Sequence, residues 1–147
     1  MPKDKDQPTP TPSLKDALFP DTHFPFTPPI YHGLDEDKRP VFYAKHISSK
    51  QAREAEQVVA QEPTIAYNET NPDTLEAYEQ DVRNFYAEKV LPLVLHIGLG
   101  KRIPGEGVTA YCHHPDVSIE DVVNLYVCAV KAVRSKRQRW ELLGNSD

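Results

Sequence analysis

An apolar segment at residues 72–99 constrains the fold most, because its spacing predicts a long helix in the core. Large side chains recur there every three or four residues, as along one face of a helix, while the opposite face carries charged residues such as Arg83. The apolar side chains are Leu75, Tyr78, Val82, Phe85, Tyr86 and Val90. Asn71 can accept hydrogen bonds from the first free amides, and Pro72 suits the first turn. Pro92 lacks a backbone donor, so the helix is expected to bend or end there.

The composition is that of an ordinary soluble domain. The chain has 147 residues, of which 39% are apolar and 27% charged, enough for one domain with terminal extensions. A net charge of −5 argues against a dedicated nucleic-acid-binding protein, since such proteins usually carry a basic excess. Two cysteines are too few for a disulfide framework, which favours an intracellular, reducing compartment. The N-terminus lacks the apolar run of a secretory signal, and no segment reaches the roughly 18 apolar residues of a membrane span.

Residues 1–30 differ from the rest of the chain, because they hold eight of its fourteen prolines. The alternating prolines at residues 7–12 are typical of an extended polyproline segment. Large apolar side chains follow them, namely Leu14, Leu18, Phe19, Phe24, Phe26 and Ile30, and Phe19, Phe24, Phe26 and Ile30 are the candidate anchors. Two interpretations are open: the arm folds back onto its own domain, or it lies across a neighbouring protein and these side chains act as anchors. We predict the second, with an arm at 1–30, a domain at 31–143 and a tail at 144–147.

The other segments alternate between strand and helix patterns. The predicted elements are a turn at 31–39, a strand at 40–47, a helix at 48–62, a connector at 64–71 with a possible strand at Ile65 and Tyr67, a glycine-rich loop at 98–107, a strand at 108–112 and a helix at 119–143. Ser48 or Ser49 would cap the helix at 48–62. The predicted fold class is α+β: a small, helix-rich domain with three helices, two or three short strands and an extended Pro-rich N-terminal arm.

The last predicted helix combines an apolar stripe with a basic end. The stripe consists of Ile119, Val122, Val123, Tyr126, Val127, Val130 and Val133, and Ser118 is placed to cap the first turn. Basic residues near the C-terminal end complement the negative pole of the helix dipole. A tryptophan among arginines is also typical of an interface. We therefore predict that Arg137, Arg139 and Trp140 bind a partner protein, with nucleic acid as a minor contact at most.

No group of residues has the spacing of a catalytic or metal centre. His96, Cys112, His113 and His114 lack the paired spacing of zinc ligands, and a nucleophilic Cys112 would need a base that the sequence does not indicate. The glycines at 98–107 fit neither phosphate-binding fingerprint, and the acidic cluster at 35–37 lacks the ligand spacing of a calcium loop. The sequence therefore predicts no catalytic residue, no metal and no cofactor, and a protein that is not an enzyme.

Residues 31–47 resemble the opening strand of the CRAL-TRIO (Sec14-like) lipid-binding domain. The matching positions are Gly33, Asp35, Arg39, Pro40, Val41 and Tyr43, with Lys38 where the family usually has glycine. The order of later elements is also similar. This resemblance implies a small lipid-binding module, in a truncated form because the chain ends before the elements that close the family's pocket.

Two functions are thus expected from the sequence. The leading hypothesis is a non-catalytic structural subunit of a larger protein assembly, which docks onto other protein subunits through its N-terminal arm and its basic C-terminal helix. The alternative is a small lipid- or ligand-binding module that resembles a truncated CRAL-TRIO domain.

Overall fold

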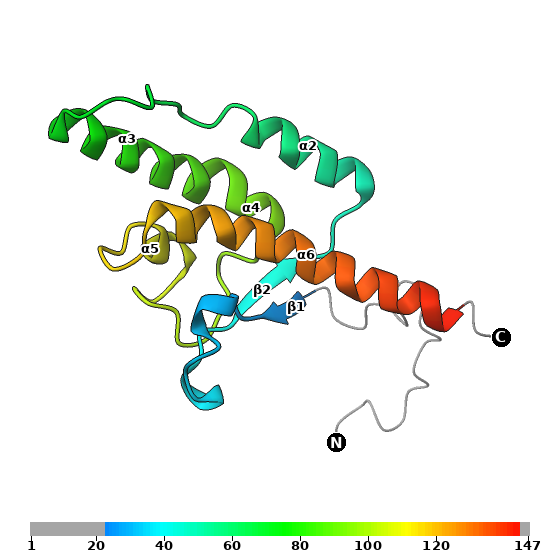
Figure 1. The fold of residues 1–147 in the computed structure, drawn as a ribbon. Helices are drawn as coiled ribbons and strands as arrows, with labels where there is room; N and C mark the ends of the chain where they lie inside the picture. Colours follow the sequence, from blue (N-terminus) through cyan, green and yellow to red (C-terminus); the bar gives the residue numbers. More distant parts are fainter. Residues whose placement is uncertain (1–22, 145–147) are drawn as a thin grey trace, which may run out of the picture.

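The computed structural model describes the backbone of residues 23–144 and the side chains of residues 23–134. This part of the chain combines a two-stranded antiparallel sheet with packed helices (Figure 1), which confirms the predicted α+β class. In chain order the elements are β1 His23–Phe26, η2 Pro29–Tyr31, η3 Glu36–Lys38, β2 Phe42–Lys45, α2 Ser49–Val59, α3 Pro72–Phe85, η4 Tyr86–Val90, α4 Leu91–Val94, α5 Val108–Cys112 and α6 Ile119–Gly144.

The sheet joins part of the predicted arm to the strand predicted at 40–47. β1 pairs with β2 in an antiparallel register that sets Phe24 opposite Ala44 and Phe26 opposite Phe42. The side chains of Phe24, Phe42 and Ala44 are buried on the side of the sheet that faces the core. β1 lies within the arm predicted at 1–30, and its pairing with β2 shows that residues 23–26 pack with the domain.

The starts of two helices agree with the sequence pattern. Ser48 caps α2, since its Oγ accepts a hydrogen bond from the Gln51 amide while the Gln51 side chain accepts one from the Ser48 amide. Asn71 caps α3, because its Oδ1 accepts from the amide of Asp73 at 2.9 Å, and Pro72 takes the first helical position. Each cap satisfies amides that have no partner within the helix.

Pro92 lies within a continuous helical run. α3 passes directly into η4, a π-helical turn in which the Leu91 amide donates to the carbonyl of Tyr86, five residues back. Pro92 then lies in the first turn of α4, where a backbone donor is not needed. The helical run ends at Val94, two residues after Pro92, and the change of turn lies immediately before Pro92. The expected bend at Pro92 stays a prediction.

The strand predicted at residues 108–112 is wrong, because these residues form the short helix α5. Val108, Tyr111 and Cys112 are buried, and their spacing of three and four residues fits one face of a helical turn. Residues 65–67 form no strand either, and the side chain of Tyr67 is fully exposed. Alternating composition over five residues is too short to separate a strand from a single helical turn.

The core lies between the sheet, α6 and the run from α3 to α4 (Figure 1). Its largest fully buried side chains are Tyr86, Tyr111, Phe24, Phe42, Leu91, Leu95 and Leu125. The start of α3 projects beyond this core, so Leu75, predicted on the apolar face, is 37% exposed. The hydroxyl groups of Tyr31 and Tyr111 are hydrogen-bonded at 3.0 Å, which links the segment after β1 to α5.

Candidate protein-binding groove

Helix α6 presents two apolar stripes: one is buried inside the core, and the other packs against the edge of the core and stays partly exposed. Val122, Leu125, Ala129 and Val133 form the inner stripe and are buried against the sheet and α3. Ile119, Val123, Tyr126, Val127 and Val130 form the outer stripe, and they are only half-buried. The sequence pattern merged members of both stripes into one, and it missed Leu125 and Ala129.

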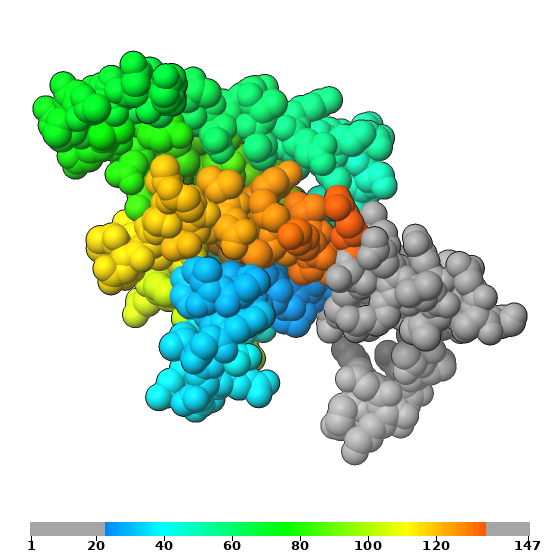
Figure 2. Space-filling view, viewed as in Figure 1, coloured from blue at the N-terminus to red at the C-terminus, as the bar shows by residue number. Residues whose placement is uncertain are grey.

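Three hollows follow one another along the outer stripe and form what we call the α6 groove. The first has a volume of about 390 Å³ and lies between α6 and α3, with Tyr78 and Val82 on the α3 side. The second, about 260 Å³, lies between α6 and α2 and shares Val127 with the first. The third, about 240 Å³, reaches the start of α2 and shares Val130 with the second. Figure 2 shows the face on which α6 runs beside α2 and α3.

The groove stays open because α2 packs against η4 and makes little contact with α6. Its apolar side chains are small: Ala55 is buried, and Ala52, Val58 and Val59 are half-buried. A helix with so thin an apolar side cannot cover the valines and the tyrosine of the outer stripe. A surface that is lined by apolar side chains therefore remains between the two helices.

Charges of opposite sign mark the two ends of the groove. Glu62 and Glu120 line it where α6 begins. Arg53, Lys131 and Arg134 line the other end, with Glu56 among them. The groove is thus acidic at one end and mainly basic at the other, so a charged partner would bind it in one preferred orientation.

Two tyrosines support the walls of this groove. The hydroxyl of the buried Tyr86 donates to Oε1 of Glu62, so the segment after α2 is tied to η4. Burial, and secondly this hydrogen bond, raises the pKa of Tyr86. Burial also raises the pKa of Tyr126, to which the nearby Glu56 contributes. Both phenols are therefore neutral at physiological pH. Tyr86 packs in the core and donates a hydrogen bond, and Tyr126 packs in the wall of the groove.

The structure separates the residues that were predicted to bind a partner. Phe24 is 1% exposed and lies in the domain's own core, so it is not an anchor for another protein as long as β1 is paired. Phe26 is half-buried and stacks on Phe42 with ring centroids 5.9 Å apart. Ile30, in η2, is 52% exposed and available for contact. Phe19 and the side chains of Arg137, Arg139 and Trp140 lie outside the described residues.

The sequence did contain a signal for the groove. Val122 is followed by Val123, and Tyr126 by Val127, so these pairs cannot all point to one side of a helix. An apolar stripe of that width predicts two contact surfaces. Only the structure shows which of them the domain itself covers.

The glycine-rich loop at 98–107 surrounds another hollow, of about 390 Å³, between Ile97 and Gly107. Two of its non-glycine residues have left-handed backbones, Arg102 with φ of 54° and Glu106 with φ of 64°. The loop is fixed to the strand side of the domain by paired backbone hydrogen bonds between Val41 and Lys101, at 2.9 and 3.0 Å. Arg102 also donates from Nε to the carbonyl of Arg39 at 2.8 Å. These contacts explain the conformation of the loop by its attachment to the domain, so we interpret it as a structural turn.

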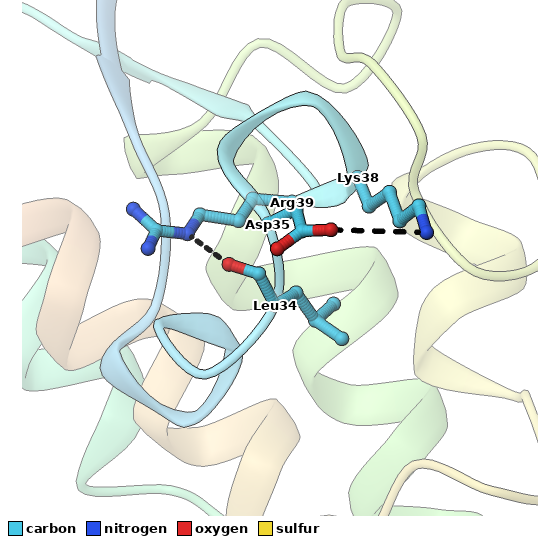
Figure 3. A network of polar contacts seen from close by, with 4 residues as sticks. All are labelled: Leu34, Asp35, Lys38 and Arg39. Carbon is cyan, nitrogen blue, oxygen red and sulfur yellow. Dashed lines mark hydrogen bonds and ion pairs between the residues drawn. The ribbon is translucent and has the colours of Figure 1, made fainter.

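The acidic turn at 31–39 is likewise held by its own residues. Figure 3 shows Arg39 reaching back, so that its Nε donates to the carbonyl of Leu34 at 2.8 Å. Lys38 lies 3.9 Å from a carboxylate oxygen of Asp35. All four side chains are at least partly exposed to solvent, and the contacts close a turn.

The residues weighed as metal ligands or nucleophiles do not converge. His96 stacks near His23 with ring centroids 4.3 Å apart, whereas His113 contacts Gln80, at 3.1 Å. His114 accepts a hydrogen bond on Nδ1 from the amide of Asp116. Among residues 23–134, no three histidine, cysteine or acidic side chains are grouped closely enough to hold a metal ion.

Cys112 is buried, and burial raises the pKa of its thiol to about 12. The thiol therefore stays protonated near neutral pH. A protonated, enclosed thiol is a poor nucleophile, because the thiolate is the reactive form.

No protein-family model matches the chain, and neither curated proteins nor solved structures match it. Within the described part of the chain, every helix is too short or too polar to cross a lipid bilayer.

Proposed function

We propose that the protein is a non-catalytic structural subunit of a larger assembly, and that the α6 groove receives an apolar helix of a partner protein. The outer stripe supports this proposal, because it is a continuous apolar surface that the domain leaves half-covered. Amphipathic helices that lie in grooves use anchors spaced by three and four residues. The stretch from residue 119 to residue 134 spans about 22 Å, which is enough for about four turns of a partner helix.

Burial and charge would each contribute to such a contact. Covering a half-buried valine, isoleucine or tyrosine side chain contributes about 1 kcal/mol, and the outer stripe offers five such side chains. The charges at the two ends of the groove would set the direction of the bound helix more than its affinity. Helices are stabilised by acidic residues at their N-terminus and basic residues at their C-terminus. The bound helix would therefore run antiparallel to α6, so that opposite charges meet.

Further contacts belong to the same proposal. Ile30 offers an exposed apolar side chain. Phe19, Arg137, Arg139 and Trp140 are proposed to contact other subunits, with nucleic acid as a minor contact of the basic end. We place the protein in a reducing compartment within the cell, because Cys112 and Cys128 are separate thiols.

A small lipid- or ligand-binding module, resembling a truncated CRAL-TRIO domain, is the alternative proposal. The observation in its favour is the hollow between α3 and α6, whose volume of about 390 Å³ falls in the range of small-molecule sites. Native mass spectrometry of the purified protein tests this alternative. A lipid retained at one copy per chain would support it.

The assembly proposal is tested by a single charge placed in the groove. Val127 lies at the junction of two hollows, so Val127→Glu should reduce incorporation of the tagged full chain into its native complex at least tenfold, as measured by size-exclusion chromatography of cell extracts. Leu34→Glu is the matched control, because Leu34 is 44% exposed and lies in the turn at 31–39. Circular dichroism should show both variants folded. Normal incorporation of folded Val127→Glu would contradict the proposal.

A further inference from the structure

We propose that the helix received by the α6 groove is α6 of a second copy of this chain, packed antiparallel. This inference rests on the proposed function, since it names the occupant of the same groove. Two observations support it: apolar side chains of the outer stripe, and the charges beside them, are placed symmetrically about the same point of α6.

Residues 123–130 of the outer stripe are self-complementary when two copies run in opposite directions, whereas Ile119 lies opposite Arg134. Tyr126 and Val127 adjoin the centre of this part. Val123 lies three residues before Tyr126, and Val130 lies three residues after Val127. An antiparallel pair therefore sets Tyr126 of each copy beside Val127 of the other, and Val123 of each beside Val130 of the other. Such a contact is isologous, the arrangement found in most soluble homodimers.

The charges follow the same symmetry. Glu120 lies six residues before Tyr126, and the position six residues after Val127 is 133, which falls between Lys131 and Arg134. Glu120 of one copy thus lies within about 3 Å, along the helix axis, of both basic residues of the other. Because of the two-fold axis, the same contact between Glu120 and the two basic residues occurs at both ends of the interface.

A parallel arrangement would place like charges together. Glu120 would face Glu120, and Lys131 would face Lys131, which is unfavourable for side chains that are being brought out of solvent. The other rim charges favour the same direction, because Glu62 lies at the Glu120 end and Arg53 at the Arg134 end. Among the described residues that line the basic end, Glu56 is the one charge of opposite sign.

The test is sedimentation equilibrium of the purified full chain, in which the wild type is expected to be a dimer at micromolar concentration. Glu120→Lys, and separately the pair Lys131→Glu with Arg134→Glu, should each weaken the dimer about tenfold or more, because they place like charges at both ends. Mixing the two variants should restore the dimer, since one end then joins the introduced lysine to the two introduced glutamates and the other end keeps the wild-type pairing of Glu120 with Lys131 and Arg134. Lys101→Glu, in the glycine-rich loop, is the control and should leave the dimer unchanged.

A monomeric wild type would overturn the inference, and so would a dimer that Glu120→Lys and Val127→Glu both leave intact. A mixture of the two charge variants that stays monomeric would also overturn it. These outcomes are separate from the test of the proposed function. A monomeric chain whose Val127→Glu variant is still lost from the native complex has another protein in its groove. A dimer whose Val127→Glu variant enters the native complex normally contradicts the proposed function.

Discussion

The guanidinium group of Arg83 donates from Nη2 to the carbonyl oxygen of Val117 at 2.6 Å, just before α6 begins. Its Nη1 donates to the carbonyls of Cys112, at 2.8 Å, and His114, at 3.3 Å. One side chain of α3 therefore satisfies three carbonyls at and after the end of α5. The same contacts fix where α6 starts relative to α3, and so they set the width of the α6 groove at its acidic end.

Replacing Arg83 with methionine should lower the free energy of unfolding by about 2–4 kcal/mol, because partly buried carbonyls lose charge-assisted hydrogen bonds. Urea denaturation followed by circular dichroism measures this loss. Arg53→Met is the matched control, since Arg53 is exposed on α2, and it should change stability by about 0.5 kcal/mol or less. Equal effects of the two substitutions would mean that the Arg83 contacts contribute nothing specific.

The role of Arg83 also shows where prediction from sequence stops. The periodicity around it correctly indicates α3, and Asn71 and Pro72 correctly mark its start, because these features act within a few residues of the chain. The same periodicity assigns Arg83 to the solvent-facing side. Its three acceptors lie 29 to 34 residues further along the chain, and nothing in the local pattern points to them.

The sheet contact of Phe24 leads to a second prediction. Phe24→Ala should lower the free energy of unfolding by about 3–5 kcal/mol, because it leaves a cavity beneath the paired strands. Ile30→Ala, four residues after the end of β1, should cost about 1 kcal/mol or less, since that side chain is 52% exposed. Thermal or urea denaturation of both variants measures the difference. If both substitutions cost the same, Phe24 is not part of the core.

Phe24 and the groove illustrate why the candidate site could be predicted only in part. Apolar residues at both ends of the chain suggest surfaces beyond one small core, yet the pattern cannot say which of these surfaces the domain itself covers. Phe24 is covered by α6 and the sheet, whereas Tyr126 and Val127 are left half-covered because α2 packs elsewhere. That outcome depends on how three helices pack, and such packing is a property of the whole fold.

The left-handed backbone of Glu106 gives a third prediction. A residue with a Cβ atom pays a steric cost at φ of 64°, so Glu106→Gly should raise the free energy of unfolding by about 0.5–1 kcal/mol. The same substitution at Glu54, which is exposed in the middle of α2, should lower it by about 1 kcal/mol. Chemical denaturation at neutral pH compares the two. Destabilisation by Glu106→Gly would show that the carboxylate makes a contact that outweighs the strain.

The buried thiol of Cys112 gives the last prediction, which concerns alkaline pH. Burial raises the pKa of this thiol in the folded protein to about 12, from an ordinary value near 9. An acid whose pKa is raised by folding binds its proton more tightly in the folded state. Its contribution to stability is therefore complete below about pH 9, and it is lost as the pH rises toward 12. The loss amounts to about 1.4 kcal/mol per pH unit within that window.

Cys112→Ala isolates this effect from that of Tyr86 and Tyr111, whose pKa values are also raised by burial. At pH 7 the alanine variant should be less stable than the wild type by about 1 kcal/mol, because it leaves a small cavity. Between pH 9 and 11 that difference should shrink and then reverse. Only the wild type has the Cys112 thiol, which ionises more readily in the unfolded chain than in the folded protein and so lowers the stability of the wild type at high pH. Urea denaturation of both proteins at half-unit steps of pH measures the difference directly. A difference in the free energy of unfolding that stays constant from pH 7 to 11 would show that burial does not raise the pKa of the Cys112 thiol. Cys112 would then have to be reconsidered as an accessible, reactive cysteine.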